Sequence, residues 1–186
     1  MRIKTVSVFA GTESHKDKEA YYYGLAYETG KLLARAGFTV ATGAGPGLMN
    51  EAMRGATEAG GATIGVVLNV PGREQSKYAS ESFAFNTLGP RQDKLVKICD
   101  ACIALPGGIG TLYEIANILA LKRIGDNELS PEKPLILIGK FYNGFEKMFD
   151  KMISEGFATA KIHTFYTHVL TPAEAVEILK KINHTL

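Results

Sequence analysis

Short apolar runs rich in β-branched residues alternate with longer segments of helical periodicity from one end of the chain to the other. Most of these runs are apolar throughout, as strands are when helices cover both faces of a parallel sheet. We therefore expect an α/β fold, a Rossmann-like, doubly wound parallel sheet flanked by helices. The expected strands are Ile3–Phe9, Phe38–Ala41, Thr63–Leu68, Ala101–Leu105, Pro134–Ile138 and Thr167–Leu170.

The segments between the strands carry helical periodicity and clear end signals. Gly60-Gly61 ends the second helix, and Thr171-Pro172 with Glu174 begins the last one. The polar stretch Asn69–Phe85 predicts a mobile loop at the rim of a site, with a short strand near Ser82–Asn86. The expected helices are Lys18–Ala36, Gly47–Ala59, Pro90–Cys99, Thr111–Ile124, Phe141–Glu155 and Pro172–Asn183.

The composition suits one domain with a full core, because the chain has 186 residues of which 46% are hydrophobic. No repeat or linker divides residues 1–186. Lys and Arg total 21 against 19 Asp and Glu, with the signs interspersed, so no basic stripe predicts a nucleic-acid partner. No apolar stretch approaches the roughly 18 residues that a membrane span needs. The N-terminus is typical of a first strand rather than a signal peptide, so we expect a cytoplasmic protein.

The two cysteines, Cys99 and Cys102, have the C-x-x-C spacing of a redox pair or of half a zinc site. They lead into an apolar run, and in an extended segment an offset of three points the side chains to opposite faces. We therefore expect buried structural thiols. The four histidines are far apart and show no metal-ligand spacing, so we expect neither a metal nor a cofactor.

Glycine-rich turns follow the first, second and fourth expected core strands. In an open parallel sheet, ligands bind beyond the carboxyl ends of the strands, where turns lead into helix N-termini. Glycine lets an anion approach the main-chain amides, and the helix dipole contributes about half a positive charge, so a phosphate is the expected ligand. The turns are Ala10-Gly-Thr-Glu13, Thr42-Gly-Ala-Gly-Pro-Gly-Leu-Met49 and Pro106-Gly-Gly-Ile-Gly-Thr-Leu-Tyr-Glu114.

Two familiar nucleotide motifs do not fit these turns. In Gly43-Ala-Gly45-Pro-Gly47 the third glycine comes too early for G-x-G-x-x-G. The next strand ends at Leu68-Asn69 without the acidic residue that holds a ribose. The turn at 106–111 lacks the Gly-Lys-Ser/Thr of a P-loop. The spacing therefore argues against a dinucleotide site and against NTP hydrolysis.

Thr111 and Glu114 allow a structural and a functional interpretation. Thr-x-x-Glu at a helix start is a capping box, in which each side chain bonds an orphan main-chain amide. Arg91 favours a functional role, because it follows Pro90 in a first helical turn, where the dipole disfavours a cation. Such an arginine should have a carboxylate or phosphate partner.

Together these motifs resemble the LONELY GUY (LOG) family, historically mislabelled as lysine decarboxylases, whose signature is P-G-G-x-G-T-x-x-E. The resemblance implies a phosphoribohydrolase. Such an enzyme hydrolyses the N-glycosidic bond of a nucleoside 5′-monophosphate, a cytokinin riboside monophosphate or AMP, to free base and ribose 5-phosphate. Decarboxylation would need pyridoxal phosphate on a lysine, and the glycine turns contain no lysine.

The resemblance also implies roles for individual positions. Arg91 and Glu114 look like the catalytic pair. Many plant-type relatives carry Arg-Lys where this chain has Arg91-Gln92. The alternative is a non-catalytic carrier of a phosphorylated cofactor such as a molybdopterin, and a dinucleotide-dependent oxidoreductase is a third interpretation. The positions that resemble the phosphate cradle and the nucleotide pocket are Gly107, Gly108, Gly110, Thr111, Gly11, Thr12, Gly43, Gly45, Gly47 and Met49.

The chemistry implied by the resemblance builds positive charge at the anomeric carbon, and a carboxylate beside the sugar stabilises that charge. We expect Glu114 to do this and to orient or deprotonate water, while Arg91 keeps Glu114 ionised.

Helix Thr111–Ile124 is apolar nearly all round and must be covered nearly all round. Either the monomer buries it or a homodimer forms through it, and the dimers common in the family favour the homodimer.

Overall fold

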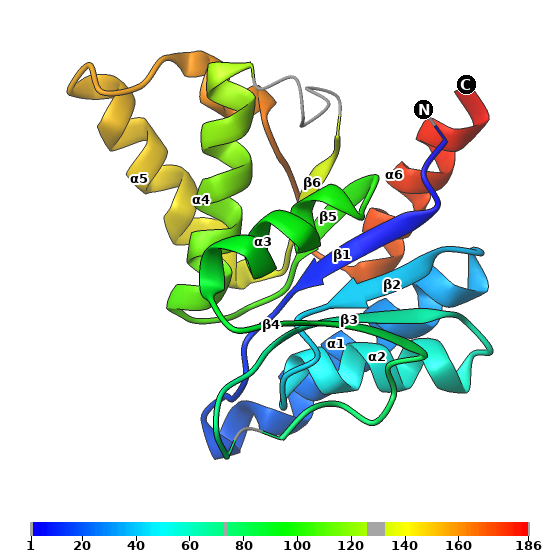
Figure 1. Cartoon of the computed structure of the whole chain (residues 1–186). Helices are drawn as coiled ribbons and strands as arrows, with labels where there is room; N and C mark the ends of the chain where they lie inside the picture. Colours follow the sequence, from blue (N-terminus) through cyan, green and yellow to red (C-terminus); the bar gives the residue numbers. More distant parts are fainter. Residues whose placement is uncertain (1, 73, 126–132, 186) are drawn as a thin grey trace.

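The computed structural model describes residues 2–72, 74–125 and 133–185. Within these ranges the chain forms one seven-stranded sheet with six α-helices and two short 3-10 helices (Figure 1). The strands are β1 (Thr5–Phe9), β2 (Thr39–Thr42), β3 (Thr63–Leu68), β4 (Glu81–Phe85), β5 (Ala101–Ala104), β6 (Leu135–Ile138) and β7 (Thr167–Val169). The helices are α1 (Lys16–Arg35), α2 (Leu48–Glu58), α3 (Leu88–Lys97), α4 (Ile109–Ile124), η1 (Lys140–Tyr142), α5 (Asn143–Ser154), η2 (Ala160–Thr164) and α6 (Pro172–Thr185).

All neighbouring strands pair in parallel, in the order β4-β3-β2-β1-β5-β6-β7. The chain starts in the middle of the sheet, builds outward to β4, and then returns to the other side of β1. The strand order therefore reverses between β1 and β5, whose carboxyl ends lie in register at Phe9 and Ala104. In an open α/β sheet this reversal is the expected place for a ligand. The predicted α/β, doubly wound parallel fold is confirmed.

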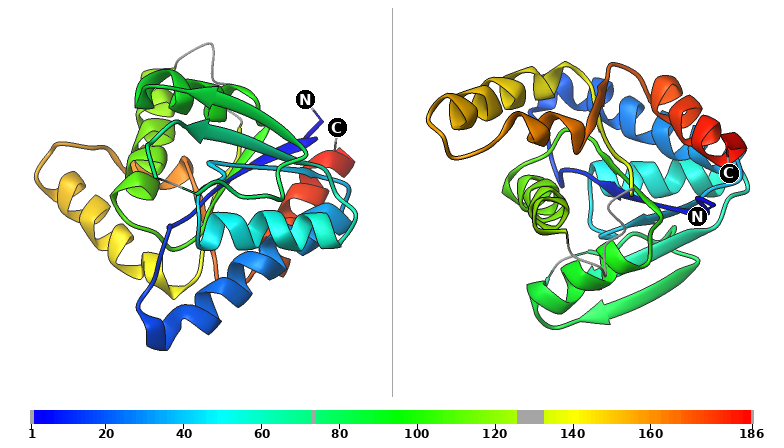
Figure 2. Two further views of the ribbon diagram at one scale, coloured as in Figure 1. Left: turned by 60° about the horizontal axis from the view of Figure 1, so that its bottom comes forward. Right: turned by 90° about the horizontal axis from the view of Figure 1, so that it is seen from above.

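Two helical layers enclose the sheet, as the views of Figure 2 also show. Helices α1, α2 and α6 pack on one face, and α3, α4 and α5 pack on the other. Strand β1 serves both layers because its side chains alternate: Val6 and Val8 belong to the first core, and Phe9 belongs to the second. Such double coverage explains why the inner strands are apolar throughout.

The prediction for the two cysteines is half right. Cys99 and Cys102 are both buried and both free, as expected. Their side chains do not point to opposite faces, because their Sγ atoms are 3.5 Å apart. The alternation rule fails here since Cys99 lies in the turn between α3 and β5, ahead of the extended segment. Among the described residues, no helix is long and apolar enough to cross a membrane.

Candidate active site

The three glycine-rich turns meet where the strand order reverses. The Gly11 amide, after β1, donates to the carbonyl oxygen of Pro106, after β5, at 3.1 Å. The Gly11 carbonyl oxygen accepts from the amide of Leu48, the first residue of α2, also at 3.1 Å. The turn after β1 is therefore bonded to the turns after β2 and β5, and the three turns form one surface.

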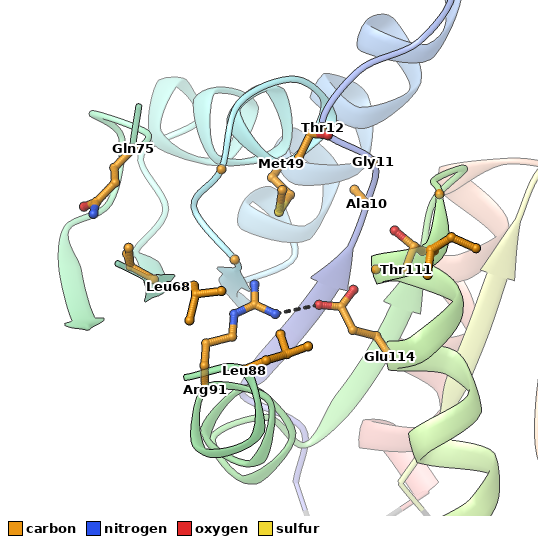
Figure 3. Close-up of a pocket in the computed structure, with 16 residues that line it drawn as sticks. Ala10, Gly11, Thr12, Met49, Leu68, Gln75, Leu88, Arg91, Thr111 and Glu114 are labelled. Carbon is orange, nitrogen blue, oxygen red and sulfur yellow. Dashed lines mark hydrogen bonds and ion pairs between the residues drawn. The ribbon is translucent and has the colours of Figure 1, made fainter. Parts of the chain in front are cut away.

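A cavity of about 240 Å³ opens at this surface (Figure 3). Its walls combine main chain from the glycine turns with side chains from α3, α4 and the end of β3. The predicted site residues that line the cavity are Gly11, Thr12, Gly43, Gly45, Met49, Arg91, Gly108, Gly110, Thr111 and Glu114. Most of the predicted set is thus gathered around a single hollow, although it comes from four separate segments of the chain.

The cavity lining does not include Gly47 or Gly107, which allow close packing behind it. Gly47 has a φ of +70°, and a Cβ there would overlap with the main chain of Thr12. A Cβ on Gly107 would overlap with the Thr111 side chain and lie 2.8 Å from the Gly11 nitrogen. Both glycines allow neighbouring turns to pack closely, and this packing explains them without a contact to substrate.

Arg91 and Glu114 form a buried ion pair at one side of the cavity. The Arg91 Nη1 donates to the Glu114 Oε1 at 2.9 Å, and the two residues are only 8% and 7% exposed. The Arg91 Nε donates to the carbonyl oxygen of Val66, in β3, at 2.9 Å. Figure 3 shows the two side chains reaching toward each other from α3 and α4. The predicted carboxylate partner of Arg91 is therefore confirmed.

Gly43 makes room for this guanidinium. A Cβ at Gly43 would overlap with the Arg91 Nη2 atom. The turn after β2 therefore requires glycine at position 43, because the Arg91 side chain lies close to the main chain there. Because Nη1 and Nε already bond to Glu114 and Val66, the Nη2 group is the part of Arg91 that is left to contact a ligand.

The capping-box interpretation of Thr111 and Glu114 is wrong. Helix α4 begins at Ile109, two residues earlier than predicted, and its N-cap is Gly108, which makes no side-chain cap. Glu114 therefore sits in the second turn, beyond the orphan amides, and its carboxylate bonds to Arg91. At this position the Glu114 side chain lines the cavity and does not bond to the main-chain amides of the first turn.

The first turn of α4 lines the cavity. The first amides of an α-helix have no intrahelical partner, and the helix dipole adds partial positive charge there. Gly108 and Gly110 line the cavity, and a Cβ at either position would have no heavy atom within 4 Å. Nothing in the packing requires glycine at these two positions. Open space beside a helix N-terminus is instead what an anion such as phosphate needs.

Burial dominates the electrostatics of the pair. Desolvation raises the pKa of the Glu114 carboxyl above its ordinary value, and the charge and hydrogen bond of Arg91 lower that pKa only in part. Arg91 therefore acts in the predicted direction, but the expectation that it controls the ionisation of Glu114 needs correction. A carboxyl group whose pKa is raised by burial accepts a proton more readily than an ordinary glutamate does.

Sequence reasoning missed several side chains that complete the cavity. Leu68 follows from the topology, since it lies at the carboxyl end of β3, on the edge of the sheet where the glycine turns leave the strands. Leu88 lies three residues before Arg91 on α3, and this helical spacing was the available signal. Gln75 belongs to the connection between β3 and β4, and no motif marks it. Leu68 and Leu88 add an apolar wall near Arg91, and Gln75 adds a polar group farther from it (Figure 3).

Comparison with known proteins identifies the family. The model of the family described as "Possible lysine decarboxylase" matches residues 49–179, which include α3, Arg91 and the whole P-G-G-x-G-T-x-x-E segment. The chain belongs to this family. A probable cytokinin riboside 5′-monophosphate phosphoribohydrolase of Oryza sativa subsp. japonica, LOGL2, is 30% identical over 185 residues, 97% of this chain and 73% of the relative. The LOG resemblance is thereby confirmed.

Solved structures of similar fold and length include proteins that are named as binding or carrier proteins, not as hydrolases. The molybdenum cofactor binding protein of Rippkaea orientalis is 25% identical, with a TM-score of 0.73 and 98% coverage of both chains. The molybdenum cofactor carrier protein of Chlamydomonas reinhardtii is 28% identical, with a TM-score of 0.70 over 97% of this chain and 98% of that one. The family fold therefore occurs in proteins named as hydrolases and in proteins named as carriers.

Proposed function

We propose that this protein is a phosphoribohydrolase that cleaves the N-glycosidic bond of a nucleoside 5′-monophosphate. The observation that carries the proposal is the buried Arg91–Glu114 pair beside the open first turn of α4, in one cavity. A carrier needs only the anion site. A carboxylate with a raised pKa, fixed next to that site, supports chemistry at the sugar. Family relatives named as phosphoribohydrolases support the same conclusion.

The substrate lies across the cavity from phosphate to base. The 5′-phosphate binds the main-chain amides at the start of α4, around Gly108 and Gly110. The ribose then reaches Glu114 and the Arg91 Nη2 group. The base packs against the apolar wall that includes Leu68 and Leu88. In this arrangement the phosphate supplies binding energy at a distance and holds the reacting carbon in place.

Cleavage proceeds as the bond between C1′ and the base nitrogen breaks and the electron pair leaves with the base. The positive charge that develops on C1′ is stabilised by the Glu114 carboxylate, which is held in a dry setting where charge interactions are strong. A water oxygen bonds to C1′ and its proton passes to Glu114. Arg91 stays protonated throughout, since its pKa is above about 12, and it orients the carboxylate. The departing base takes up one proton from solvent, and Glu114 then releases the proton it took from water, so the net reaction transfers one proton and the carboxylate is regenerated.

A substrate screen tests the proposal. The purified protein is incubated with AMP, GMP, CMP, UMP and isoprenylated AMP, and free base and ribose 5-phosphate are quantified. Release of both products in equal amounts is the expected result. Tight binding of a phosphorylated pterin without release of base from any monophosphate would instead favour the carrier function, which the names of the structural neighbours suggest.

We also propose that the protein is a homodimer joined through α4. The monomer buries only one side of this helix, including Ile115, Ile118 and Leu119. The opposite side leaves apolar and small residues exposed, so burial within the monomer is not the explanation for its composition. These exposed residues are Ile109, Leu112, Tyr113, Ala116, Ala120 and Ile124. Sedimentation of wild type and of Ala120→Glu tests this: a dimer that becomes a monomer supports it, and a monomeric wild type contradicts it.

A further inference from the structure

Helix α3 buries two consecutive polar side chains, and the proposed mechanism uses only one of them. Gln92 follows Arg91 and is 1% exposed. Its Oε1 accepts from the Arg91 Nη1 at 3.5 Å. Its Nε2 is fully buried and has no hydrogen-bond partner among the described residues. A buried donor without an acceptor destabilises a fold, and an apolar side chain of the same length would not have this defect.

The contact with Arg91 is weak for a geometric reason. Nη1 serves two acceptors, the Glu114 Oε1 at 2.9 Å and the Gln92 Oε1 at 3.5 Å. A hydrogen bond between a guanidinium and a carboxylate is strong, whereas a bond of 3.5 Å to a neutral amide is at the limit of the interaction. While Glu114 is ionised, it therefore holds Nη1, and the Gln92 oxygen is nearby but scarcely used.

The balance changes when Glu114 becomes protonated, which the proposed function requires in each turnover. A protonated carboxyl is a poorer acceptor, and the buried Arg91 then needs another one, because an unpaired buried cation is costly. We propose that Gln92 is a positioning residue that provides this alternative acceptor for Arg91 whenever Glu114 carries a proton. This role for Gln92 rests on the proposed function. The contacts of the Arg91 Nη1 with Gln92 and Glu114 do not depend on it.

The other polar groups described next, near Glu114 and Arg91, already have hydrogen-bond partners. Among the described residues, the titratable side chains that interact with Glu114 are Arg91, from α3, and Tyr142, from η1. The Tyr142 hydroxyl donates to the Leu105 carbonyl oxygen at 2.6 Å, and burial together with the Glu114 charge raises its pKa, so it stays neutral. The Val66 carbonyl oxygen is bonded to the Arg91 Nε. In the part of the chain that the structure describes, Gln92 is thus the side chain with an acceptor still available beside the Arg91 Nη1.

This role predicts a measurable change in Glu114. If Gln92 stabilises the state in which Glu114 is protonated, then removing its oxygen destabilises that state more than the ionised one. The pKa of Glu114 must then fall. A fall of about 0.5 to 1 corresponds to the loss of one neutral hydrogen bond. A side chain that merely fills space would leave this pKa unchanged when replaced by one of similar volume.

The test is a carboxyl ¹³C NMR titration of the full-length protein, with the Glu114 signal assigned by its loss in Glu114→Gln. Gln92→Met keeps the length of the side chain, and Gln92→Leu removes the same oxygen with a different shape. Both variants should lower the pKa of Glu114. Gln75→Met, at the other glutamine of the chain, should not. An unchanged or raised pKa of Glu114 in the folded Gln92 variants would overturn the inference.

The titration also separates this inference from the proposed function. If the wild type releases base and the Glu114 pKa is unchanged in Gln92→Met, the role of Gln92 is wrong and the hydrolase remains. If no monophosphate is hydrolysed but the pKa falls in both variants, the contact is real and the proposed function fails. In an active enzyme the acidic limb of kcat should move to lower pH together with the NMR value.

Discussion

Arg91 and Glu114 lie 23 positions apart in the sequence, on two different helices, and meet in a buried ion pair with Nη1 2.9 Å from Oε1. Such a pair is weak evidence for stability, because desolvating two charges offsets most of their attraction. Its place at the wall of a cavity, beside a helix N-terminus with open amides, has a better explanation in chemistry.

Replacing Arg91 by lysine should abolish most activity while keeping the positive charge. A lysine has one ammonium and does not reach both the Val66 carbonyl oxygen and Glu114 in the geometry of the guanidinium. We expect kcat to fall at least about 100-fold, the scale of one charged catalytic group. Arg35→Lys, at an exposed arginine of α1, is the matched control and should have wild-type kinetics. Near-normal kcat in Arg91→Lys would show that charge alone suffices.

Gly43→Ala should damage the site through Arg91. The added methyl would overlap with the Arg91 Nη2, so the guanidinium must move away from its bonds to Val66 and Glu114. A displacement of about 1 Å at a reacting group can cost roughly 100-fold in rate. Steady-state kinetics should show most of the loss in kcat. A crystal structure of the variant with Arg91 unmoved and activity intact would refute this explanation of the glycine.

Gly110→Ala should separate binding from folding. The methyl enters open space in the cavity, where we propose that the phosphate binds, and the residue is helical. We expect KM for AMP to rise roughly 5- to 10-fold, the loss of one hydrogen bond of about 1 kcal/mol. The free energy of unfolding should rise by about 0.5 kcal/mol.

The matched control for that experiment is Gly24→Ala, at an exposed position inside α1 that is also free of neighbours within 4 Å. It should gain similar stability with an unchanged KM. Equal KM values for the two alanine variants would mean that the phosphate does not bind at the start of α4.

The raised pKa of Glu114 predicts an acidic limb of kcat above the ordinary glutamate value of 4.5. The ionised carboxylate is the active form, so the rate should fall tenfold per pH unit below that pKa. Because the folded pKa exceeds the unfolded one, protonation favours the fold, and the stability from Glu114 is lost as pH rises through the folded value. Glu114→Gln should remove this dependence from a series of melting curves. A limb at or below 4.5 would contradict the burial argument.

The sequence contains the pattern Thr-x-x-Glu at the start of two helices, and the outcomes differ. At α6, Glu174 accepts from the amides of Leu170 and Thr171, and Thr171 accepts from the Glu174 amide, as a capping box does. At α4 the same letters begin two residues inside the helix, and Glu114 bonds to Arg91. Local sequence did not reveal where α4 begins. Arg91 was the useful signal, because the dipole disfavours a cation in the first turn of a helix unless that cation has a partner.

The parallel sheet with helices on both faces and the glycine turns were predictable because hydrophobic periodicity and turn residues are local properties. The remaining contacts depend on tertiary packing. Nothing in the sequence indicates that the Val66 carbonyl oxygen anchors Arg91, that Gly43 makes room for it, or that Gln92 is buried with an unpaired amide. The prediction that Cys99 and Cys102 point to opposite faces was wrong for the same reason, since Cys99 lies in a turn and not in the strand that the alternation rule assumes.

Product release by Glu114→Gln is the decisive measurement. Glutamine keeps the size of the side chain and an acceptor oxygen for Arg91, so the variant should fold and bind AMP, yet release adenine and ribose 5-phosphate at least about 100-fold more slowly than wild type. Glu177→Gln, at an exposed ion pair of α6, should remain fully active. Wild-type release of both products by a folded Glu114→Gln protein would contradict a catalytic role for this carboxylate.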